Sequence, residues 1–579
     1  MSERTRFGSA SELREKGQLI GKVGSLPVVA VWLDDEAYAI EDRCPHLGFP
    51  LHQGTFESGM VTCHWHHARF DLASGCTLDP WADDGTAFDV AIVDDEVFVE
   101  ARPPRPVAER WERRLRDGLE HDLTLVLAKS VQALLELPDG QDRILRIAYE
   151  FGDRNRAEGW GSGMTVLTCM ANLLPHLAAD DRPLAMVHAL RFLADDVRGR
   201  APRFAQPPLG SAGQPSARLA AWYRRFVETR SADGAERALI TAIGQSDLGE
   251  VEQFMFAAAT DHVYLDGGHT LDFTNKAFEA IGHLGDGSGA MLTSLVAQTC
   301  AADRAEESSE WNHPIDLRSL ADLTEVELCV ALAVGGNAGN ADTGTGIDVG
   351  ALGWTLLADE PQAVTEALVA AACAGGTAEE LARAVALAAA LRLVRFHLNN
   401  DPGDWDTVHH TFTYANAVHQ AVVRQAVVRQ PAPDIVRGIV HGALRVYLDR
   451  FLNVPAARLP TSTSATLDAL ASCWDVQGAV DAAGDAVAGF LRGGGSRAEL
   501  VAALGHALLQ EDAGFHWYQS IEAGVRQSSA WPEGSDEALL VLVGIARFLA
   551  AHTPTRRELA TISRTAVRLR RGDALFADA

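Results

Sequence analysis

A short proline-rich segment, Ala101-Arg-Pro-Pro-Arg-Pro106, divides the sequence into two parts of different character. Before it, runs such as 26–33 and 87–93 alternate Val, Ile, Phe and Trp at period two, which is typical of half-buried strands. After it, Ala, Leu, Arg and Glu recur at helical spacing, as in 381–393. Helices rarely cross a proline run. We therefore expect a multidomain chain: a small all-β domain at residues 1–101, a linker at 102–106 and a large all-α domain at 107–579.

The charge balance of the chain limits its partners. Asp and Glu number 78 and Lys and Arg 50, which gives a formal net charge of -28 at pH 7. A surface this acidic repels phosphate backbones and anionic lipid headgroups, so we expect neither nucleic acid nor a membrane as a partner. The apolar fraction of 47% and the charged fraction of 22% are those of an ordinary globular protein.

The sequence also predicts where the protein is found. The N-terminus is polar and lacks the apolar core of a signal peptide. No apolar run reaches the ~20 residues that span a bilayer. The eight cysteines are too sparse for a disulfide scaffold. We expect a soluble cytoplasmic protein with reduced thiols.

The strongest motif lies in the predicted β domain. Cys44-Pro-His46 is followed, after sixteen residues, by Cys63-His-Trp-His66. Two such loops can offer two thiolates and two imidazoles to one small metal site. Zinc is one candidate for a Cys2His2 set, although Cys-x-His places the ligands closer than a common zinc knuckle does.

This motif resembles the Rieske family of [2Fe–2S] proteins, in which two histidines replace two cysteines on one iron. The similarity continues through Leu51-His-Gln-Gly54, Gly59-Met-Val-Thr-Cys63 and Ala68-Arg-Phe-Asp-Leu-Ala-Ser-Gly75, and it covers roughly residues 5–101. The resemblance implies a [2Fe–2S] cluster that accepts and passes single electrons. It also implies the ligands: Cys44 and Cys63 on one iron, and His46 and His66 on the other.

Two departures from the family pattern are informative. Respiratory Rieske domains carry a disulfide between the cluster loops, but Phe49 and Trp65 stand at the corresponding positions here. The domain therefore resembles the ferredoxin and oxygenase type, whose potentials are lower. The glycine that usually follows the last ligand is His67 in this chain.

A His-bearing pattern recurs in the helical part. In each copy an Asp precedes a His by three or four residues, and an Asn or Glu follows the His by six. The copies are Asp266, His269 and Asn275; Asp406, His410 and Asn416; and Asp512, His516 and Glu522. The Asp suits a helix N-cap, which would put the His on the first turn. In a degenerate first copy, Trp160 stands at the His position.

These copies predict divergent helical repeats that pack around a common centre. The candidate ligands of a second metal site there are His188, His269, His410, His441 and His516. Neutral imidazoles suit iron, zinc or copper. Accidental similarity among Ala-rich helices, with ordinary repeat packing, is the alternative. Lys276 lies two turns after His269 and could take part in the chemistry of this site, but we expect it to be an ordinary solvent-exposed lysine.

The common Rieske oxygenase reading fails for the helical part. The Asp-His-His ligand run of those enzymes is absent after residue 106, and their catalytic fold is α+β. Short pieces such as Pro183-Leu-Ala-Met-Val-His188-Ala-Leu, and the helix of His410, instead resemble the questin-oxidase-like family. Those proteins are all-helical non-haem iron oxygenases with a His-rich site. We do not transfer their substrate.

These observations lead to two hypotheses of different class. In the first, the protein is an oxidoreductase whose cluster passes electrons to a His-bound mononuclear non-haem iron, which uses O2 to hydroxylate or cleave a small organic substrate. An external reductase or ferredoxin would be the electron donor, because the sequence has no flavin or NAD fingerprint. In the second, the chain is a Rieske-type electron carrier or redox sensor, and the helical repeats are a non-catalytic scaffold that binds a partner. No catalytic residue is assigned.

Overall fold

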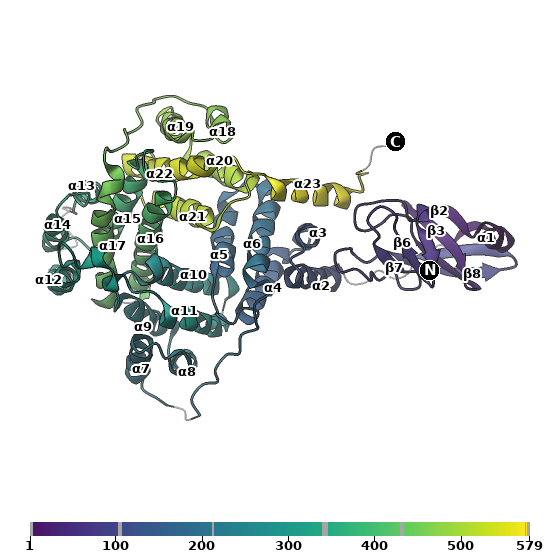
Figure 1. The fold of residues 1–579 in the computed structure, drawn as a ribbon, viewed down its shortest axis with the longest axis horizontal. Coiled ribbons are helices and arrows are strands. Elements are labelled where there is room, and N and C mark those ends of the chain that lie inside the picture. The colour runs from purple at the N-terminus through teal and green to yellow at the C-terminus, as the bar shows by residue number, and fades with distance from the viewer. Residues whose placement is uncertain are drawn as a thin grey trace. The chain divides into compact units, whose positions relative to one another are not determined.

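The computed structural model describes residues 4–101, 107–210, 213–285, 287–337, 346–428, 433–573 and 575. By contacts it divides into two compact units. Unit 1 comprises residues 1–147 and 558–579, and unit 2 comprises residues 148–557. The predicted order, a small all-β part followed by a large helical part, is confirmed (Figure 1).

Two antiparallel sheets form the β part of unit 1. The larger has the order β1-β9-β8-β4-β3-β2, and the smaller has the order β5-β6-β7. Two hairpins of the larger sheet turn at Asp34-Asp35 and Asp94-Asp95, where both residues have positive φ, as a two-residue type I′ turn requires. The strands are β1 Thr5–Ser9, β2 Gln18–Val23, β3 Leu26–Leu33, β4 Glu36–Glu41, β5 Thr55–Glu57, β6 Met60–Thr62, β7 Arg69–Asp71, β8 Ala87–Val93 and β9 Glu96–Ala101.

The alternation along β3 builds two cores on the two faces of the larger sheet. Val29 and Val31 pack on one face together with Cys44 and Cys63, the two predicted cluster cysteines. Side chains one residue away, such as Val28, pack on the other face against α1 (Ala10–Lys16). The small sheet lies on the first face, since Val61 and Phe70 belong to that core. The two cysteines thus pack against one face of the larger sheet.

Helices complete unit 1. Helix α2 (Val107–Glu120) packs on α3 (Thr124–Leu135), and α23 (Glu558–Arg571) packs on α3 from the far end of the chain. Arg570 Nε donates to Glu136 Oε1 at 3.0 Å, which ties α23 to the end of α3. Helix α4 (Gly140–Arg154) runs across the boundary between the units.

Unit 2 is helical throughout its described residues, apart from loops. Its helices are α5 Ser162–Leu173, α6 Arg182–Val197, α7 Ser216–Glu228, α8 Ala232–Ile243, α9 Leu248–Thr260, α10 His269–Leu284, α11 Val296–Ala301, α12 Leu317–Asn337, α13 Val349–Thr355, α14 Pro361–Cys373, α15 Ala378–Val394, α16 Asp404–Val428, α17 Pro433–Leu448, α18 Leu467–Cys473, α19 Val480–Arg492, α20 Arg497–Gln510, α21 Phe515–Ser529 and α22 Asp536–His552. Among the residues described, no helix is both long and apolar enough to cross a membrane.

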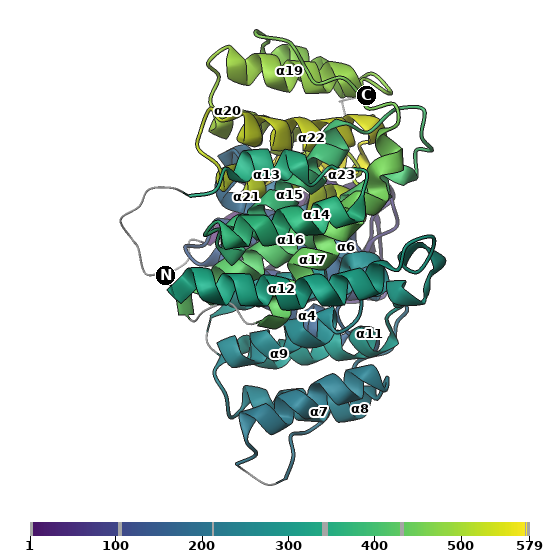
Figure 2. The same ribbon diagram turned by 90° about the vertical axis from the view of Figure 1, so that its left-hand side faces the viewer.

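Four helices form the centre of unit 2. Helices α5, α10, α16 and α21 pack on one another, and α6, α9, α15, α17 and α22 surround them (Figure 1). Helices α12, α13 and α14 add a layer on one face (Figure 2). The inner helices α10, α16 and α21 are those that carry the recurring His, and α5 follows Trp160 of the degenerate copy. The repeated pattern therefore marks the innermost helices.

Candidate metal centres

The two predicted cluster loops share one backbone geometry. In the first, the Cys44 amide donates to the Phe49 carbonyl at 2.7 Å, and the Gly48 amide donates to the Cys44 carbonyl at 2.8 Å. In the second, the same pair of bonds joins Cys63 to Ala68 and His67 to Cys63, each at 2.9 Å. The fifth residue of each loop has a left-handed backbone, with φ of 87° at Gly48 and 62° at His67. This geometry explains why a glycine is usual at the position of His67.

The four predicted ligands form two close pairs, one of thiols and one of imidazoles. Both cysteines are buried, and the hydrogen bond from the Cys44 thiol lowers the pKa of Cys63 to about 6. The rings of His46 and His66 lie 4.9 Å apart between centroids. Burial lowers the pKa of His46 to about 4, which keeps its imidazole neutral, and its buried Nδ1 has no hydrogen-bond partner in the described structure. Two adjacent thiols and an orphaned imidazole nitrogen fit the ligand set of a [2Fe–2S] cluster with mixed Cys and His ligands.

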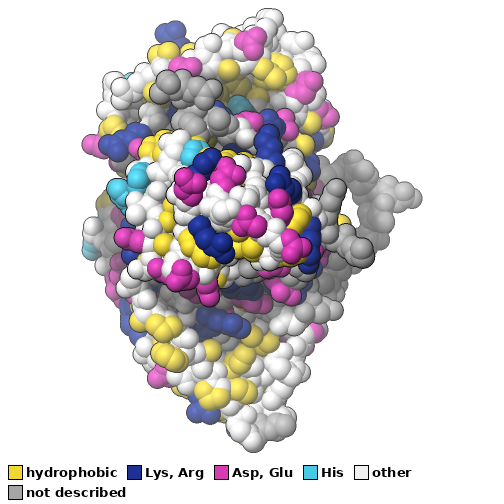
Figure 3. Space-filling view, turned by 90° about the vertical axis from the view of Figure 1, so that its right-hand side faces the viewer, with side chains coloured by type: hydrophobic (Ala, Val, Ile, Leu, Met, Phe, Trp, Pro, Cys, Tyr) yellow, Lys and Arg dark blue, Asp and Glu magenta, His cyan; other side chains and the backbone are white. Residues whose placement is uncertain are grey.

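Aromatic and polar side chains surround this site. Trp81 packs edge-on against His46 at 4.9 Å, and Trp65 lies 4.7 Å from His66. His66 is exposed. Histidine, acidic and basic side chains all reach the surface on the face that Figure 3 views. His52 pairs with Asp42 through its Nδ1 at 2.6 Å. The site thus combines buried thiols with an exposed histidine edge, through which electrons can enter or leave.

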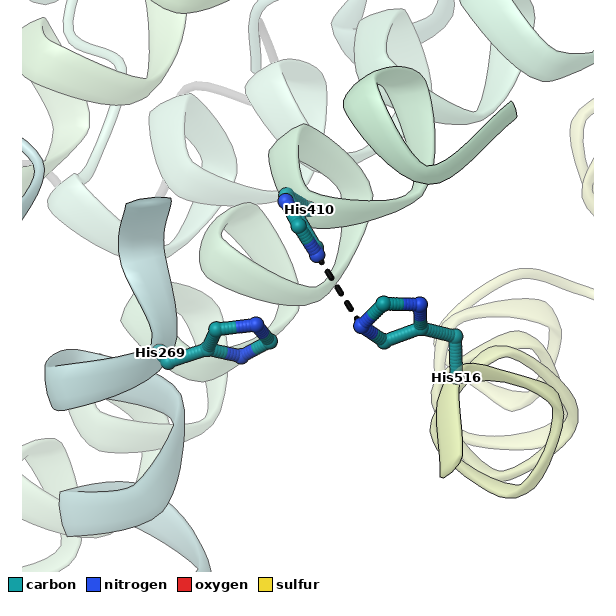
Figure 4. A group of neighbouring side chains, drawn as sticks. All are labelled: His269, His410 and His516. Atoms are coloured by element: carbon teal, nitrogen blue, oxygen red, sulfur yellow. Dashed lines mark hydrogen bonds between the residues drawn. The ribbon is translucent and has the colours of Figure 1, made fainter. Parts of the chain in front are cut away.

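A second group of histidines forms in unit 2. His269 is the first residue of α10, His516 is the second residue of α21, and His410 lies on the second turn of α16. One ring nitrogen from each lies within 4.8 Å of the others (Figure 4). The Nε2 atoms of His410 and His516 are 3.1 Å apart, and the ring centroids of His269 and His410 are 4.5 Å apart. Three imidazoles from three helices therefore face one point.

The electrostatics of this histidine trio, His269, His410 and His516, favour metal binding. Burial lowers the pKa of His269 to about 4 and that of His410 to about 3, so both rings are neutral near pH 7. Asp406 Oδ1 accepts from His516 Nδ1 at 2.9 Å. Although burial opposes it, the contact with His516 holds the pKa of Asp406 below its usual value. A proton fixed on Nδ1 leaves the lone pair of His516 on Nε2, the atom that faces His410 and that a metal would use.

The other two candidate histidines lie outside the trio. His188 is fully buried, and its Nδ1 is 2.7 Å from Tyr518 Oη while its Nε2 is 3.1 Å from the Leu509 carbonyl. Both of its ring nitrogens are thus occupied by hydrogen bonds within the protein. His441 is also buried and lies beside Trp311, with 6.3 Å between ring centroids. Neither belongs to the metal-capable group found among the described residues.

The prediction that the recurring Asp caps each helix is wrong. Asp406 lies inside α16, and the residues before α10 and α21 are Gly268 and Gly514, neither of which caps through a side chain. Gly267 and Gly268 have positive φ, and a Cβ on Gly268 would lie 3.0 Å from the Tyr264 ring. The chain therefore enters α10 through a turn that needs glycine, and the carboxylate of Asp406 serves a neighbouring helix instead.

Lys276 is not the exposed lysine that we expected. It is 1% exposed, its Nζ lies 2.9 Å from Glu279 Oε2, and it also pairs with Glu522. Asn275 Nδ2 donates to Glu279 at 3.0 Å. Two of the residues that follow the recurring His by six, Asn275 and Glu522, thus belong to one buried polar cluster. The six-residue spacing in the sequence pointed to these two residues, but the sequence alone does not show that they share the buried partners Lys276 and Glu279.

Sequence reasoning missed one neighbour of the trio and its cavity. His409 is buried, its ring lies 4.8 Å from that of His516, and its Nδ1 is 2.5 Å from Ser520 Oγ. A cavity of about 330 Å³ opens beside His410. Its other lining residues include Tyr264, Gly267, Thr407 and Arg445. A small molecule in this cavity would lie next to His410 of the trio.

Comparison with known proteins identifies the class of the β part. Residues 3–89 match the family model of the Rieske [2Fe-2S] domain. This match establishes a Rieske [2Fe–2S] domain at residues 3–89, as the resemblance predicted. A domain of this class carries single electrons.

The particular relatives include electron carriers and enzymes. Apoptosis-inducing factor 3 of Homo sapiens is 36% identical over 89 residues, which are 15% of this chain and 15% of that protein. Ferredoxin CarAc of Metapseudomonas resinovorans is 28% identical over 81 residues, 14% of this chain and 76% of the ferredoxin. The 4beta-methylsterol monooxygenase of Methylococcus capsulatus is 48% identical over 42 residues, 7% of this chain and 11% of that enzyme.

A solved structure is also similar to part of the chain. The ferredoxin of carbazole 1,9a-dioxygenase from Nocardioides aromaticivorans is 27% identical, with a TM-score of 0.17, and covers 17% of this chain and 100% of the ferredoxin. Each of these four matches covers less than a fifth of this chain. The chain spans only 15% of the length of apoptosis-inducing factor 3.

Proposed function

We propose that the histidine trio binds a mononuclear non-haem iron and that the Rieske cluster supplies its electrons. The iron would support O2-dependent hydroxylation or oxidative cleavage of a small organic substrate. The observation that carries this proposal is the convergence of three imidazoles, two of them held neutral by burial, near the N-terminal ends of three helices. Placing donor and acceptor on one chain raises their effective concentration.

The choice of iron rests on the neighbouring domain. Three imidazoles suit iron, copper or zinc, but zinc has no redox chemistry and would have no use for a Rieske donor. Bound iron would supply one-electron chemistry with O2 at the trio. Three protein ligands would leave further coordination positions of such an iron to small molecules.

The chain's own residues would orient the substrate. The cavity beside His410 has room for a small molecule, and Arg445, Tyr264 and Thr407 are among the residues that line it. Arg445 lies over the Tyr264 ring at 5.3 Å and pairs with Glu310 at 2.7 Å, so its guanidinium is held in one place. A fixed guanidinium in the wall favours a substrate with at least one polar group.

The electron donor is proposed to be a separate protein. CarAc and the anthranilate 1,2-dioxygenase ferredoxin subunit of Burkholderia cepacia are both named as ferredoxins, and the latter as a subunit of a dioxygenase. By analogy, a reductase or another ferredoxin would reduce the cluster of this chain, with His66 at the exposed edge.

Metal analysis tests the proposal. Anaerobically purified protein should hold the two irons and two labile sulfides of the cluster and one further iron. A His269→Ala/His410→Ala variant should lose only the further iron. His506→Ala, which changes an exposed histidine paired with Asp181, is the control and should keep it.

One observation favours the alternative of a non-catalytic scaffold. The hydrogen bond between His410 and His516, with the contact to Asp406, gives these rings partners without any metal. On that hypothesis the protein is a Rieske-type electron carrier or redox sensor. Iron and sulfide would then match the cluster alone, in the wild type as in the variant.

A further inference from the structure

A lysine from outside the matched domain contacts the first cluster loop. Lys129 lies on α3, forty residues past the end of the Rieske match at residue 89. Its Nζ donates to the carbonyl oxygens of Pro45 at 2.7 Å and His46 at 2.8 Å. Its side chain is 9% exposed. An ammonium group is therefore held on the backbone of a cluster ligand, away from bulk water.

A buried carboxylate pairs with this ammonium group. Lys129 Nζ lies 2.9 Å from Asp83 Oδ2, and the Asp83 side chain is 5% exposed. Asp83 stands two residues after Trp81, whose ring packs on His46. Lys129 and Asp83 therefore link two segments, the loop that carries His46 and the loop that carries Trp81.

Helix α2 fixes the second of these segments. Arg114 is 3% exposed and lies 3.3 Å from Asp83. Its Nη2 also donates to the carbonyls of Pro80 at 2.7 Å and Ala82 at 2.9 Å. Helices α2 and α3 therefore hold both the loop that carries His46 and the loop that carries Trp81. The charges are fixed by at least two contacts each, so solvent cannot screen them by rearrangement.

We propose that Lys129 and Asp83 are opposing positioning residues that set the reduction potential of the Rieske cluster. Reduction adds one electron to the cluster, so a nearby ammonium stabilises the reduced state and a nearby carboxylate destabilises it. Both charges are buried, where Coulomb interactions are stronger than in water. The two helices after the linker are thereby part of the cluster's electrostatic environment. This inference does not depend on iron in unit 2.

The test is the midpoint potential of the cluster in the full-length protein, measured by spectroelectrochemical titration at one pH. For Lys129→Met we expect a fall that makes one-electron reduction at least tenfold less favourable, about 59 mV. For Asp83→Asn we expect a rise. The double variant should lie between the two single variants. Lys129→Arg should restore most of the wild-type value, and Lys22→Met, on an exposed lysine of β2, should change nothing.

A merely structural role predicts a different result. If Lys129 only holds the loop in shape, Lys129→Met and Asp83→Asn would shift the potential in the same direction, or not at all, and either outcome overturns the proposal. Visible absorption of the cluster reports occupancy in each variant. Should Lys129→Met fail to retain the cluster, Asp83→Asn decides alone: a rise supports the proposal, and an unchanged or lower potential overturns it.

Discussion

Asp406 Oδ1 lies 2.9 Å from Nδ1 of His516, across the gap between α16 and α21. Asp406 comes one turn before His410 on its own helix, so one short segment presents both an imidazole and the carboxylate that orients a second imidazole. A carboxylate behind a ligating histidine fixes its tautomer and raises its basicity. The relationship is the pattern expected of a metal ligand and its supporting partner.

Removing this carboxylate should weaken metal binding at the trio. For Asp406→Ala we expect the dissociation constant for ferrous iron to rise about 10- to 100-fold, because His516 loses the partner that fixes its Nδ1 proton. Anaerobic titration against a chelator measures it. Asp536→Ala, on an exposed acid in the first turn of α22, is the control. Equal constants for the two variants would show that Asp406 does not serve the site.

Asp272 should make stability depend on pH. Burial raises its pKa from 3.8 to about 7, and the carboxylate is 1% exposed. Its contribution is therefore complete below about pH 4 and is lost as the pH rises towards about 7, by on the order of 4 kcal/mol at most. Asp272→Asn stays neutral, so its melting temperature should rise relative to that of the wild type between about pH 4 and about pH 7. Asp468→Asn, at an exposed position, is the control. A difference in melting temperature between Asp272→Asn and the wild type that stays the same at every pH would refute the raised pKa of Asp272.

Replacing Lys276 should destabilise unit 2. Lys276→Met leaves Glu279 and Glu522 buried without their ammonium partner, at a cost of about 3–5 kcal/mol. Scanning calorimetry should show a clear fall in the transition of the helical unit. Lys22→Met removes an exposed lysine and should leave that transition in place. A melting temperature equal to that of the control would mean that the buried cluster contributes nothing.

Replacing His67 should stabilise the second cluster loop. His67 has a φ of 62°, which costs a residue with a Cβ about 1 kcal/mol more than glycine. His67→Gly should therefore raise the temperature at which the cluster absorption is lost on heating. His64 is also exposed but is not among the residues with positive φ, so His64→Gly should give no such gain. A gain from both, or from neither, would argue against backbone strain at His67.

Local motifs made the β part predictable. The four predicted cluster ligands lie in two short loops, and the short spacing within each loop was enough to select them from the sequence. The strands follow from period-two alternation, since Val29 and Val31 must share one face of β3. The proline segment itself lies outside the described residues.

Contacts between distant helices were harder to predict. The pattern selected His269, His410 and His516, but it gave equal weight to His188 and His441, because spacing does not tell which way each helix is rotated. Asp406 looked like a cap because its partner, His516, is over a hundred residues away. Lys276 looked exposed because a lone lysine usually is, whereas its two acidic partners come from α10 and α21.

The most direct test of the proposed second centre is diffraction from crystals of anaerobically purified protein at wavelengths on either side of the iron absorption edge. The account predicts anomalous density at two places: one between the loops of Cys44 and Cys63, and one between the rings of His269, His410 and His516. Density at the cluster alone, with the His410–His516 hydrogen bond intact, would contradict it and leave unit 2 as a scaffold.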